Sequence, residues 1–132
     1  MQTNYLIYSS RPFGFDASTL NSILVVARRN NVRDGITGAL IVRADLYLQW
    51  LEGPAAALAA LFARICADDR HLEITKLDSG TLAERRFDAW AMRDDPARSW
   101  LWDAAAVANG AVAAAPVSEI HNVFDRMMLE PV

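Results

Sequence analysis

Residues 47–54, Tyr-Leu-Gln-Trp-Leu-Glu-Gly-Pro (YLQWLEGP), determine how the rest of this chain can fold. The run of large apolar residues predicts a strand over 46–52, and Gly53-Pro54 predicts the start of a helix, because proline is tolerated in a first helical turn. Gln49 stands in the middle of this strand, among apolar neighbours. A buried amide costs free energy unless its donors and its acceptor find partners, so Gln49 needs specific partners.

Patterns on both sides of this stretch indicate an α+β fold. Segments rich in β-branched and aromatic residues predict four further strands, at 4–9, 36–42, 72–80 and 85–92. Apolar residues at helical spacing predict two helices, one from an N-cap at Ser18 to about Asn30 and one from Gly53-Pro54 to residues 68–71. The order is β-α-β-β-α-β plus a fifth strand, which is ferredoxin-like and places both helices on one face of the sheet.

Tyr8 and Gln49 are expected to lie near each other in this fold. The strands at 4–9 and 46–52 are central neighbours in a ferredoxin-like sheet. Side chains alternate between the two faces of a strand, so Tyr8 and Gln49 can both point toward the helices. Trp50 then points to the opposite face.

Residues 96–132 are predicted to form a helical extension of a domain that spans 1–95. Trp100 to Trp102 begin an alanine-rich helix, and an apolar repeat predicts a second one, at Ile120, Val123, Phe124, Met127 and Met128. Two helices on one face leave the other face of the sheet bare. We therefore expect the extension to cover that face, including Leu48 and Trp50.

Composition excludes several classes of function. The 132 residues carry a net charge of −3 and no basic stripe, which argues against a nucleic-acid partner. The single cysteine, Cys66, excludes an internal disulfide and a cysteine-based zinc site, and it is interpreted as a small core residue. No apolar tract is long enough for a membrane span and the start lacks a signal-peptide pattern. We expect a cytoplasmic protein without a membrane partner or a metal.

Common catalytic motifs are missing from the sequence. It contains no G-x-G-x-x-G after a strand, no P-loop, no H-E-x-x-H and no G-x-S-x-G. His71 and His121 have no evident nucleophile beside them. The run Asp-Asp-Arg-His at 68–71 could be an acid–base cluster, but such runs are more often solvated helix ends.

Four further residues gain interest when they are taken together. Asn30 and Asn31 would each suit a helix C-terminus. Side by side, their amides would also suit a planar ring with alternating C=O and N–H groups. Trp90 and Met92, on the last predicted strand, are each typical of a core. Combined with Tyr8 and Gln49 on strands, they suggest a binding site.

Five segments in this order resemble the BLUF family of flavin-binding blue-light sensors. They are LIYSS, NNVRDGITGALI, LQWLEGP, RICADDRH and RFDAWAM, and they span roughly residues 4–95. The resemblance implies a non-covalently bound FAD, with FMN or riboflavin as alternatives, in a photoreceptor that is not an enzyme. The short chain is similar to the members that signal to a separate downstream protein.

The resemblance also implies roles for individual residues. Tyr8 matches the tyrosine that gives an electron and a proton to the excited flavin. Gln49 matches the glutamine between that tyrosine and the flavin N5/C4=O edge, whose amide changes tautomer or orientation in light. Asn31 matches the residue that holds the C4=O and N3–H edge, and Asn30 its neighbour near C2=O.

The remaining roles concern the rest of the flavin and the signal. The resemblance implies further flavin-binding residues, Arg64 and Asp68 at the ribityl and phosphate end and Ile23 and Leu24 on the first helix. It implies residues that carry the signal to the last strand, Ser10, Trp90 and Met92. Whether Trp90 or Met92 lies beside Gln49 is left open by the sequence.

Two functions remain open from the sequence alone. The first is a photosensory module, and the second is a ferredoxin-like small-molecule-binding protein or enzyme without light sensing. Tyr8 and Gln49 distinguish them, because a fold without flavin gains nothing from that buried pair. Tryptophan-rich surfaces predict a homodimer or a higher oligomer, although packing within one chain would satisfy the same residues.

Overall fold

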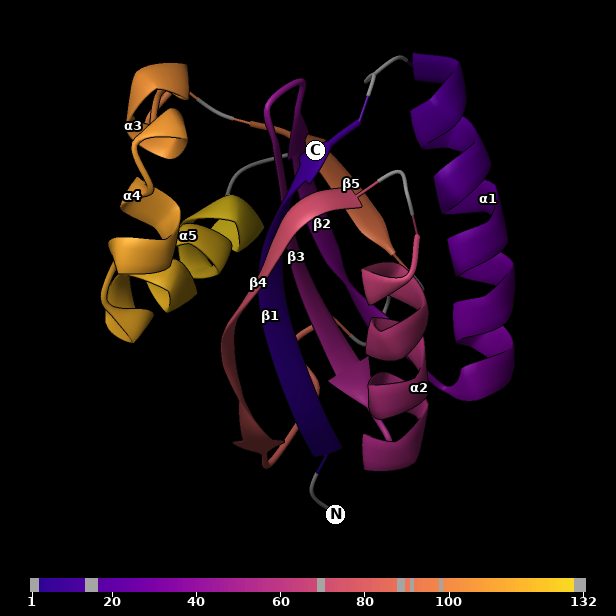
Figure 1. Ribbon diagram of the computed structural model, residues 1–132. Coiled ribbons are helices and arrows are strands. Elements are labelled where there is room, and N and C mark those ends of the chain that lie inside the picture. The colour runs from indigo at the N-terminus through magenta and orange to yellow at the C-terminus, as the bar shows by residue number, and fades with distance from the viewer. Residues whose placement is uncertain are drawn as a thin grey trace.

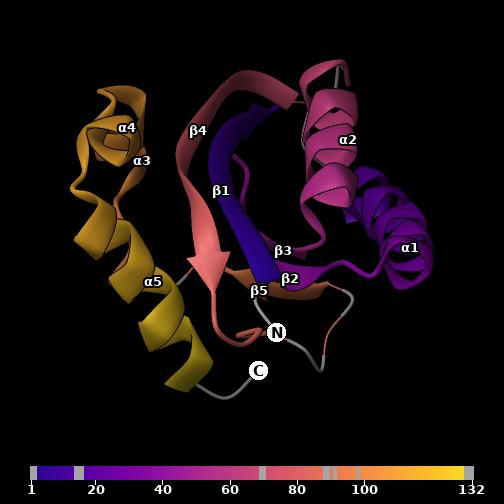
Figure 2. The ribbon, with the colours of Figure 1, turned by 90° about the horizontal axis from the view of Figure 1, so that it is seen from below.

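The computed structural model describes residues 3–13, 17–68, 71–87, 90, 92–97 and 99–129. Within these ranges a five-stranded sheet lies between two layers of helices (Figure 1). The elements are β1 (Thr3–Pro12), α1 (Ala17–Asp34), β2 (Thr37–Arg43), β3 (Leu46–Gly53), α2 (Ala55–Cys66), β4 (His71–Leu82), β5 (Arg93–Pro96), α3 (Ala104–Ala108), α4 (Ala111–Ala114) and α5 (Val117–Leu129). Helices α1 and α2 cover one face of the sheet, and α3 to α5 lie on the other (Figure 2).

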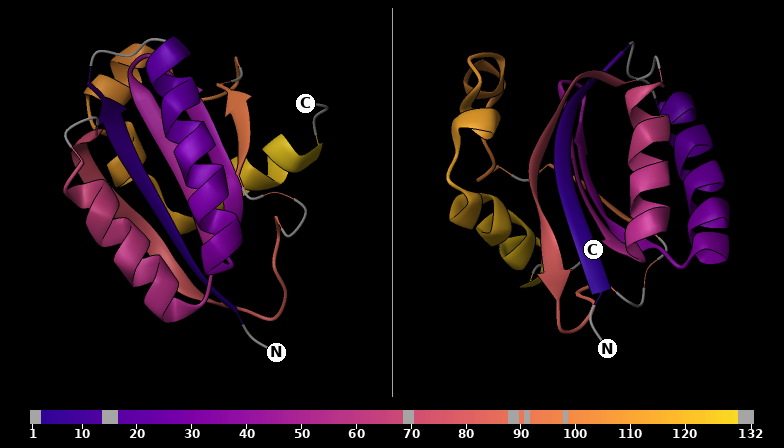
Figure 3. Two further views of the ribbon diagram at one scale, coloured as in Figure 1. Left: turned by 90° about the vertical axis from the view of Figure 1, so that its right-hand side faces the viewer. Right: turned by 60° about the horizontal axis from the view of Figure 1, so that its bottom comes forward.

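The strand order is β4-β1-β3-β2-β5, with β1 and β3 in the predicted central positions. These two strands are antiparallel and place Tyr8 directly opposite Gln49. Strand β5 is parallel to β2 and forms one edge, next to α1 in the left panel of Figure 3. The predicted α+β, ferredoxin-like fold class is confirmed.

The tail helices cover the second face of the sheet, as expected. Leu48 and Trp50 are both fully buried there. The Trp50 ring stacks on Tyr5 with 5.0 Å between centroids and meets Phe124 of α5 edge-on at 5.5 Å. Burying a large apolar side chain contributes about 1.5–3 kcal/mol, so these contacts hold α5 against the sheet. Trp50 therefore offers no exposed surface for self-association.

Polar contacts also join α5 to the sheet. His121 Nε2 lies 2.7 Å from Asp78 Oδ2, and the Tyr5 hydroxyl donates to the same oxygen at 2.6 Å. Burial opposes the ionisation of Asp78, but the hydrogen bonds from Tyr5 and His121 outweigh it and hold the pKa of Asp78 below its ordinary value. Burial and the bond to Asp78 raise the pKa of Tyr5 to about 12.

The fifth strand lies further along the chain than predicted. The sequence predicts it at 85–92, whereas β5 spans 93–96. The main-chain amides of Arg86 and Phe87 donate to the buried carboxylate of Glu52, at 2.9 and 2.8 Å, instead of to a neighbouring strand. The prediction was wrong because this contact, distant in sequence, replaces strand pairing. Residues 88, 89 and 91 of the predicted strand lie outside the described residues.

Helix α1 is one turn longer than predicted. It continues past Asn30 to Asp34 and ends before Gly35, whose φ of +70° is the left-handed conformation that commonly follows a helix. Asn31 therefore lies within the helix and not at its end. Ser18 also lies inside the helix, so the predicted N-cap is wrong.

Two smaller predictions were wrong in detail. Helix α2 ends at Cys66, which is exposed and not a core residue. The alanine-rich tract forms two short helices, separated at Gly110. The first of them begins after Asp103, whose side chain accepts from the Ala106 amide at 2.8 Å, and not at Trp100. A side-chain cap decides this start, and alanine content alone does not reveal it.

Candidate functional site

A cavity of about 220 Å³, open to solvent, lies between α1, α2 and the face of the sheet that they cover. Every residue that the resemblance assigns to flavin binding lines it, namely Tyr8, Ile23, Leu24, Asn30, Asn31, Gln49, Arg64 and Asp68. Met92 lines it as well. Apolar side chains and a few polar groups line it together, which is typical of small-molecule sites.

Gln49 finds its partners at the base of this cavity. The Tyr8 hydroxyl donates a hydrogen bond to Gln49 Oε1. On the other side, Gln49 Nε2 donates to Met92 Sδ at 3.2 Å. All three side chains are buried, with 1% of Tyr8, 8% of Gln49 and 2% of Met92 exposed. A thioether is a weak acceptor, so the amide is held firmly at its oxygen and weakly at its nitrogen.

Tyr8 is held in its neutral form. Burial raises the pKa of Tyr8 well above the ordinary tyrosine value of 10.0. Its ring contacts Phe62 at 5.7 Å between centroids and His71 at 6.1 Å, and only 1% of the residue is exposed. The phenol therefore acts as a hydrogen-bond donor to Gln49 and cannot release its proton alone at neutral pH.

The two asparagines lie on the last turns of α1. Asn31 is 2% exposed, and both side chains line the cavity. Arg64, on α2, is half-exposed at the mouth, where its Nη2 lies 3.8 Å from Asp34 Oδ2. Amides on one wall, a cation at the mouth and aliphatic side chains between them match a flat ring that carries C=O and N–H groups and an anionic tail. The residues present thus fit a flavin.

Trp90 and Met92 differ in position. Met92 contacts Gln49, whereas Trp90 is 38% exposed and does not line the cavity. The Trp90 carbonyl accepts from the Gly38 amide at 3.2 Å, which connects it to β2. The structure therefore places Met92, and not Trp90, beside Gln49.

Ser10 lies two residues beyond Tyr8 on the same face of β1, outside the cavity lining. Its hydroxyl is 2.8 Å from His71 Nδ1, and His71 does line the cavity. The His71 ring also contacts Tyr47, with 5.2 Å between centroids. Sequence reasoning missed His71 because a histidine that opens an edge strand looks the same as one that ends a helix.

Arg28 is a second residue that sequence reasoning missed. Its Nε and Nη2 donate to the Met92 carbonyl oxygen at 3.1 and 3.0 Å. Arg28 therefore joins α1 to the main chain of the residue that contacts Gln49. Its position three residues before Asn31 places the two on one side of the helix, which was the available signal.

Clusters of metal ligands and membrane-spanning helices are both absent from the part of the chain that the structure describes. No three or more His, Cys, Asp or Glu side chains there gather as metal ligands would. Over the same residues, no helix combines the length and apolar character needed to cross a bilayer.

Comparison with known proteins agrees with this geometry. The family model of BLUF, sensors of blue-light using FAD, matches residues 4–93. Photoactivated adenylate cyclase subunit beta of Euglena gracilis is 34% identical over 89 residues, which is 67% of this chain and 10% of that protein. The chain thus spans about a tenth of the length of that curated relative.

Two solved structures are similar to the fold. The dark-state structure of BlrB, a BLUF protein, has a TM-score of 0.69 and 35% identity, and the match covers 72% of this chain and 73% of that one. The BlsA ground state has a TM-score of 0.83 over 99% of this chain and 90% of that one. At 23% identity, the likeness to BlsA concerns the fold alone, but it includes the tail helices.

Proposed function

Because the chain belongs to the BLUF family of blue-light sensors that use FAD, we propose that it is a photoreceptor, and not an enzyme, in which light reverses the Gln49 amide. The observation that carries this proposal is the buried hydrogen bond from Tyr8 to Gln49 Oε1, with Gln49 Nε2 on the Met92 sulfur. A buried phenol and a buried amide that meet at a cavity lined by apolar and polar side chains form a pair that can exchange a proton and reorient.

The proposed cofactor is FAD, with FMN and riboflavin as alternatives. Asn30 and Asn31 would hold the polar edge of the ring, and Ile23 and Leu24 would cover its face. At the open mouth, Arg64 and Asp68 would hold the ribityl and phosphate end. Support for this comes from their shared position around one cavity.

The chemistry of the switch follows from the two ends of the amide. A flavin held in this cavity would supply the blue-light absorption and an acceptor for one electron and one proton, both of which would return to Tyr8 afterwards. Tyr8 releases its hydroxyl proton only together with an electron, because burial disfavours the phenolate. Gln49 Oε1 accepts the hydrogen bond along which that proton moves. A turn or tautomer change of Gln49 then makes the donor and acceptor ends trade places, at no change in net charge.

The output must be finely balanced because this change is small. One hydrogen bond contributes about 0.5–1.5 kcal/mol, which shifts a two-state equilibrium by about tenfold at most. We propose that Met92 passes the change to β5, that Ser10 and Trp90 contribute, and that a helical extension at 96–132 presents it to a separate protein. The sensor domain would be 1–95, in a cytoplasmic homodimer or higher oligomer.

Flavin loading and illumination test this proposal. The purified protein should be yellow or take up added FAD, and blue light should shift its absorption reversibly to the red. Tyr8→Phe should keep the flavin and lose the shift. Tyr47→Phe, which changes another buried tyrosine in the cavity lining, is the matched control and should keep both. A protein that takes up no flavin, or a Tyr8→Phe variant with a normal shift, would contradict the assignment.

A further inference from the structure

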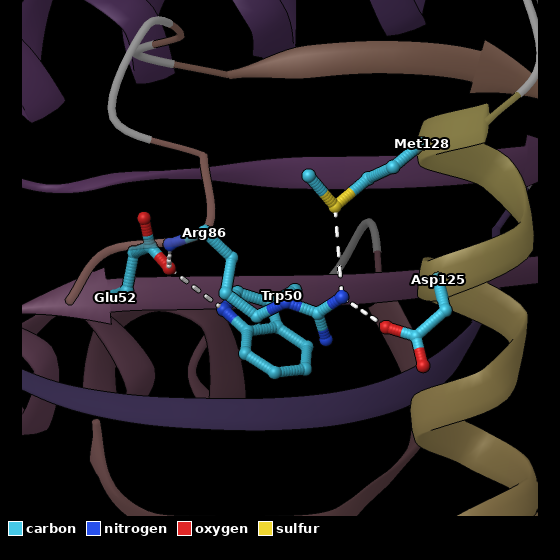
Figure 4. A network of polar contacts seen from close by, with 5 residues as sticks. All are labelled: Trp50, Glu52, Arg86, Asp125 and Met128. Carbon is cyan, nitrogen blue, oxygen red and sulfur yellow. Dashed lines mark hydrogen bonds and ion pairs between the residues drawn. The ribbon is translucent and has the colours of Figure 1, made fainter. Parts of the chain in front are cut away.

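Glu52 is a fully buried carboxylate on the opposite face of β3 from Gln49. Among the described residues it accepts four hydrogen bonds, from Trp50 Nε1 at 3.1 Å, Arg86 N at 2.9 Å, Thr37 Oγ1 at 2.8 Å and Phe87 N at 2.8 Å. Figure 4 shows the carboxylate between Trp50 and the main chain of Arg86. Glu52 thus fixes Arg86 and Phe87, within the β4–β5 connection, to the strand that carries Gln49.

The side chain of Arg86 extends from this fixed point to the tail. Its guanidinium lies over the Trp50 ring, 5.0 Å from the centroid. Its Nη2 forms an ion pair with Asp125 of α5 and lies 3.6 Å from Met128 Sδ (Figure 4). The Arg86 and Asp125 side chains are 25% and 49% exposed, so this pair is not locked in the core. Arg86 therefore connects the sheet to α5.

The same connection reaches Gln49 at its other end. Phe87 packs in the core under the tail helices, whereas Met92, five residues later, packs in the core under α1 and α2. Phe87 and Met92 therefore lie on opposite faces of the sheet. Met92 accepts from Gln49 Nε2, and the Met92 carbonyl accepts from Arg28. A change at Gln49 acts on one end of a short segment whose other end carries Arg86.

We propose that Arg86, positioned by Glu52, transmits the orientation of Gln49 to helix α5, an inference that rests on the proposed function. Reversing Gln49 removes its donor from the weakly accepting Met92 sulfur, which alters the equilibrium of the connection by less than the roughly tenfold limit of an ordinary hydrogen bond. A partly exposed ion pair such as Arg86–Asp125 changes an equilibrium constant by up to about fivefold. The two effects are of similar size, so the loss at Met92 is large enough to bias the Arg86–Asp125 pair, while the apolar contacts keep α5 on the sheet.

Hydrogen exchange of the α5 amides, in dark and under steady blue light, tests this relay in the FAD-loaded protein. In the wild type, α5 should exchange about 1.5- to 5-fold faster in light, the range that such a pair supplies. Arg86→Gln keeps the main-chain bond to Glu52 but removes the pair. It should keep the red shift, show fast α5 exchange in the dark and lose the light–dark difference.

Two further variants guard against a structural explanation. Asp125→Asn removes the same ion pair from the α5 side and should reproduce Arg86→Gln. Arg43→Gln breaks a comparable pair with Asp45 in the β2–β3 turn and should leave the light–dark difference of α5 unchanged. A structural role alone would change dark and light exchange equally, so the difference is the decisive readout.

The outcomes separate the relay from the photochemistry. A wild type with the red shift but equal α5 exchange in dark and light would overturn the relay and leave the proposed function intact. So would an Arg86→Gln or Asp125→Asn variant with a normal light–dark difference. A wild type that binds flavin without any red shift would overturn the proposed function and the relay with it.

Discussion

Replacing Glu52 with glutamine tests how strongly the β4–β5 connection is held. Each carboxylate oxygen now accepts two donors, Trp50 Nε1 with Arg86 N on one and Thr37 Oγ1 with Phe87 N on the other. An amide keeps one oxygen and presents an NH₂ group in place of the second.

The better of the two amide orientations still leaves a donor without a partner. With the amide oxygen toward Trp50 and Arg86, the NH₂ group faces the Phe87 amide, and Thr37 must turn its hydroxyl away. An unsatisfied buried donor costs about 1–3 kcal/mol, and the weaker remaining bonds add to this. We expect Glu52→Gln to lower the free energy of unfolding by about 2–4 kcal/mol.

Urea unfolding, followed by far-ultraviolet circular dichroism at a fixed excess of FAD, measures this loss. With a slope of about 2 kcal/mol per molar urea, the midpoint should fall by about 1–2 M. Glu119→Gln, on the exposed side of α5, is the matched control and should shift it by less than about 0.3 M. A Glu52→Gln midpoint as close to wild type as that of Glu119→Gln would mean that the four contacts do not hold the connection.

Two other substitutions probe each face of the sheet. Arg28→Ala removes both hydrogen bonds to the Met92 carbonyl. The variant should keep the flavin and the red shift, but its recovery in the dark should slow by up to about tenfold. Exposed Arg29→Ala is the control, and an Arg28→Ala recovery as fast as that of the control would contradict this prediction. Asp78 has a lowered folded pKa, so it stabilises the fold above its ordinary value of 3.8 and loses that contribution as pH falls below it. In Asp78→Asn, the free energy of unfolding should fall less steeply than in the wild type as pH drops below 3.8. The same fall in both proteins would contradict a contribution from Asp78.

Local pattern was sufficient for the parts of the fold that depend on neighbours in sequence. Side chains alternate between the two faces of a strand, and the strands at 4–9 and 46–52 were expected at the centre of the sheet, which together predicted that Tyr8 and Gln49 lie close together. The helical spacing of apolar residues predicted α2 and α5. The fifth strand could not be found this way. The aromatic residues of 85–92 suggested a strand, but a carboxylate distant in sequence takes up the main-chain amides of Arg86 and Phe87.

The candidate site shows the same division. The resemblance supplied residues that line one cavity, yet the bonds of Arg28 to Met92 and of Ser10 to His71 cross between elements. No periodicity of a single segment encodes such contacts. Whether Trp90 or Met92 neighbours Gln49 depended likewise on which of the two side chains reaches the cavity, which only the three-dimensional structure reveals.

The light-minus-dark infrared spectrum of FAD-loaded protein with isotope-labelled glutamine tests the reversal of Gln49 most directly. The chain contains only two glutamines, Gln2 and Gln49, so the label reports on very few groups. We expect a label-sensitive carbonyl band that shifts on illumination, returns in the dark and is absent from Gln49→Leu. A red-shifted flavin without any glutamine band, or the same band in Gln49→Leu, would contradict the switch proposed for Gln49.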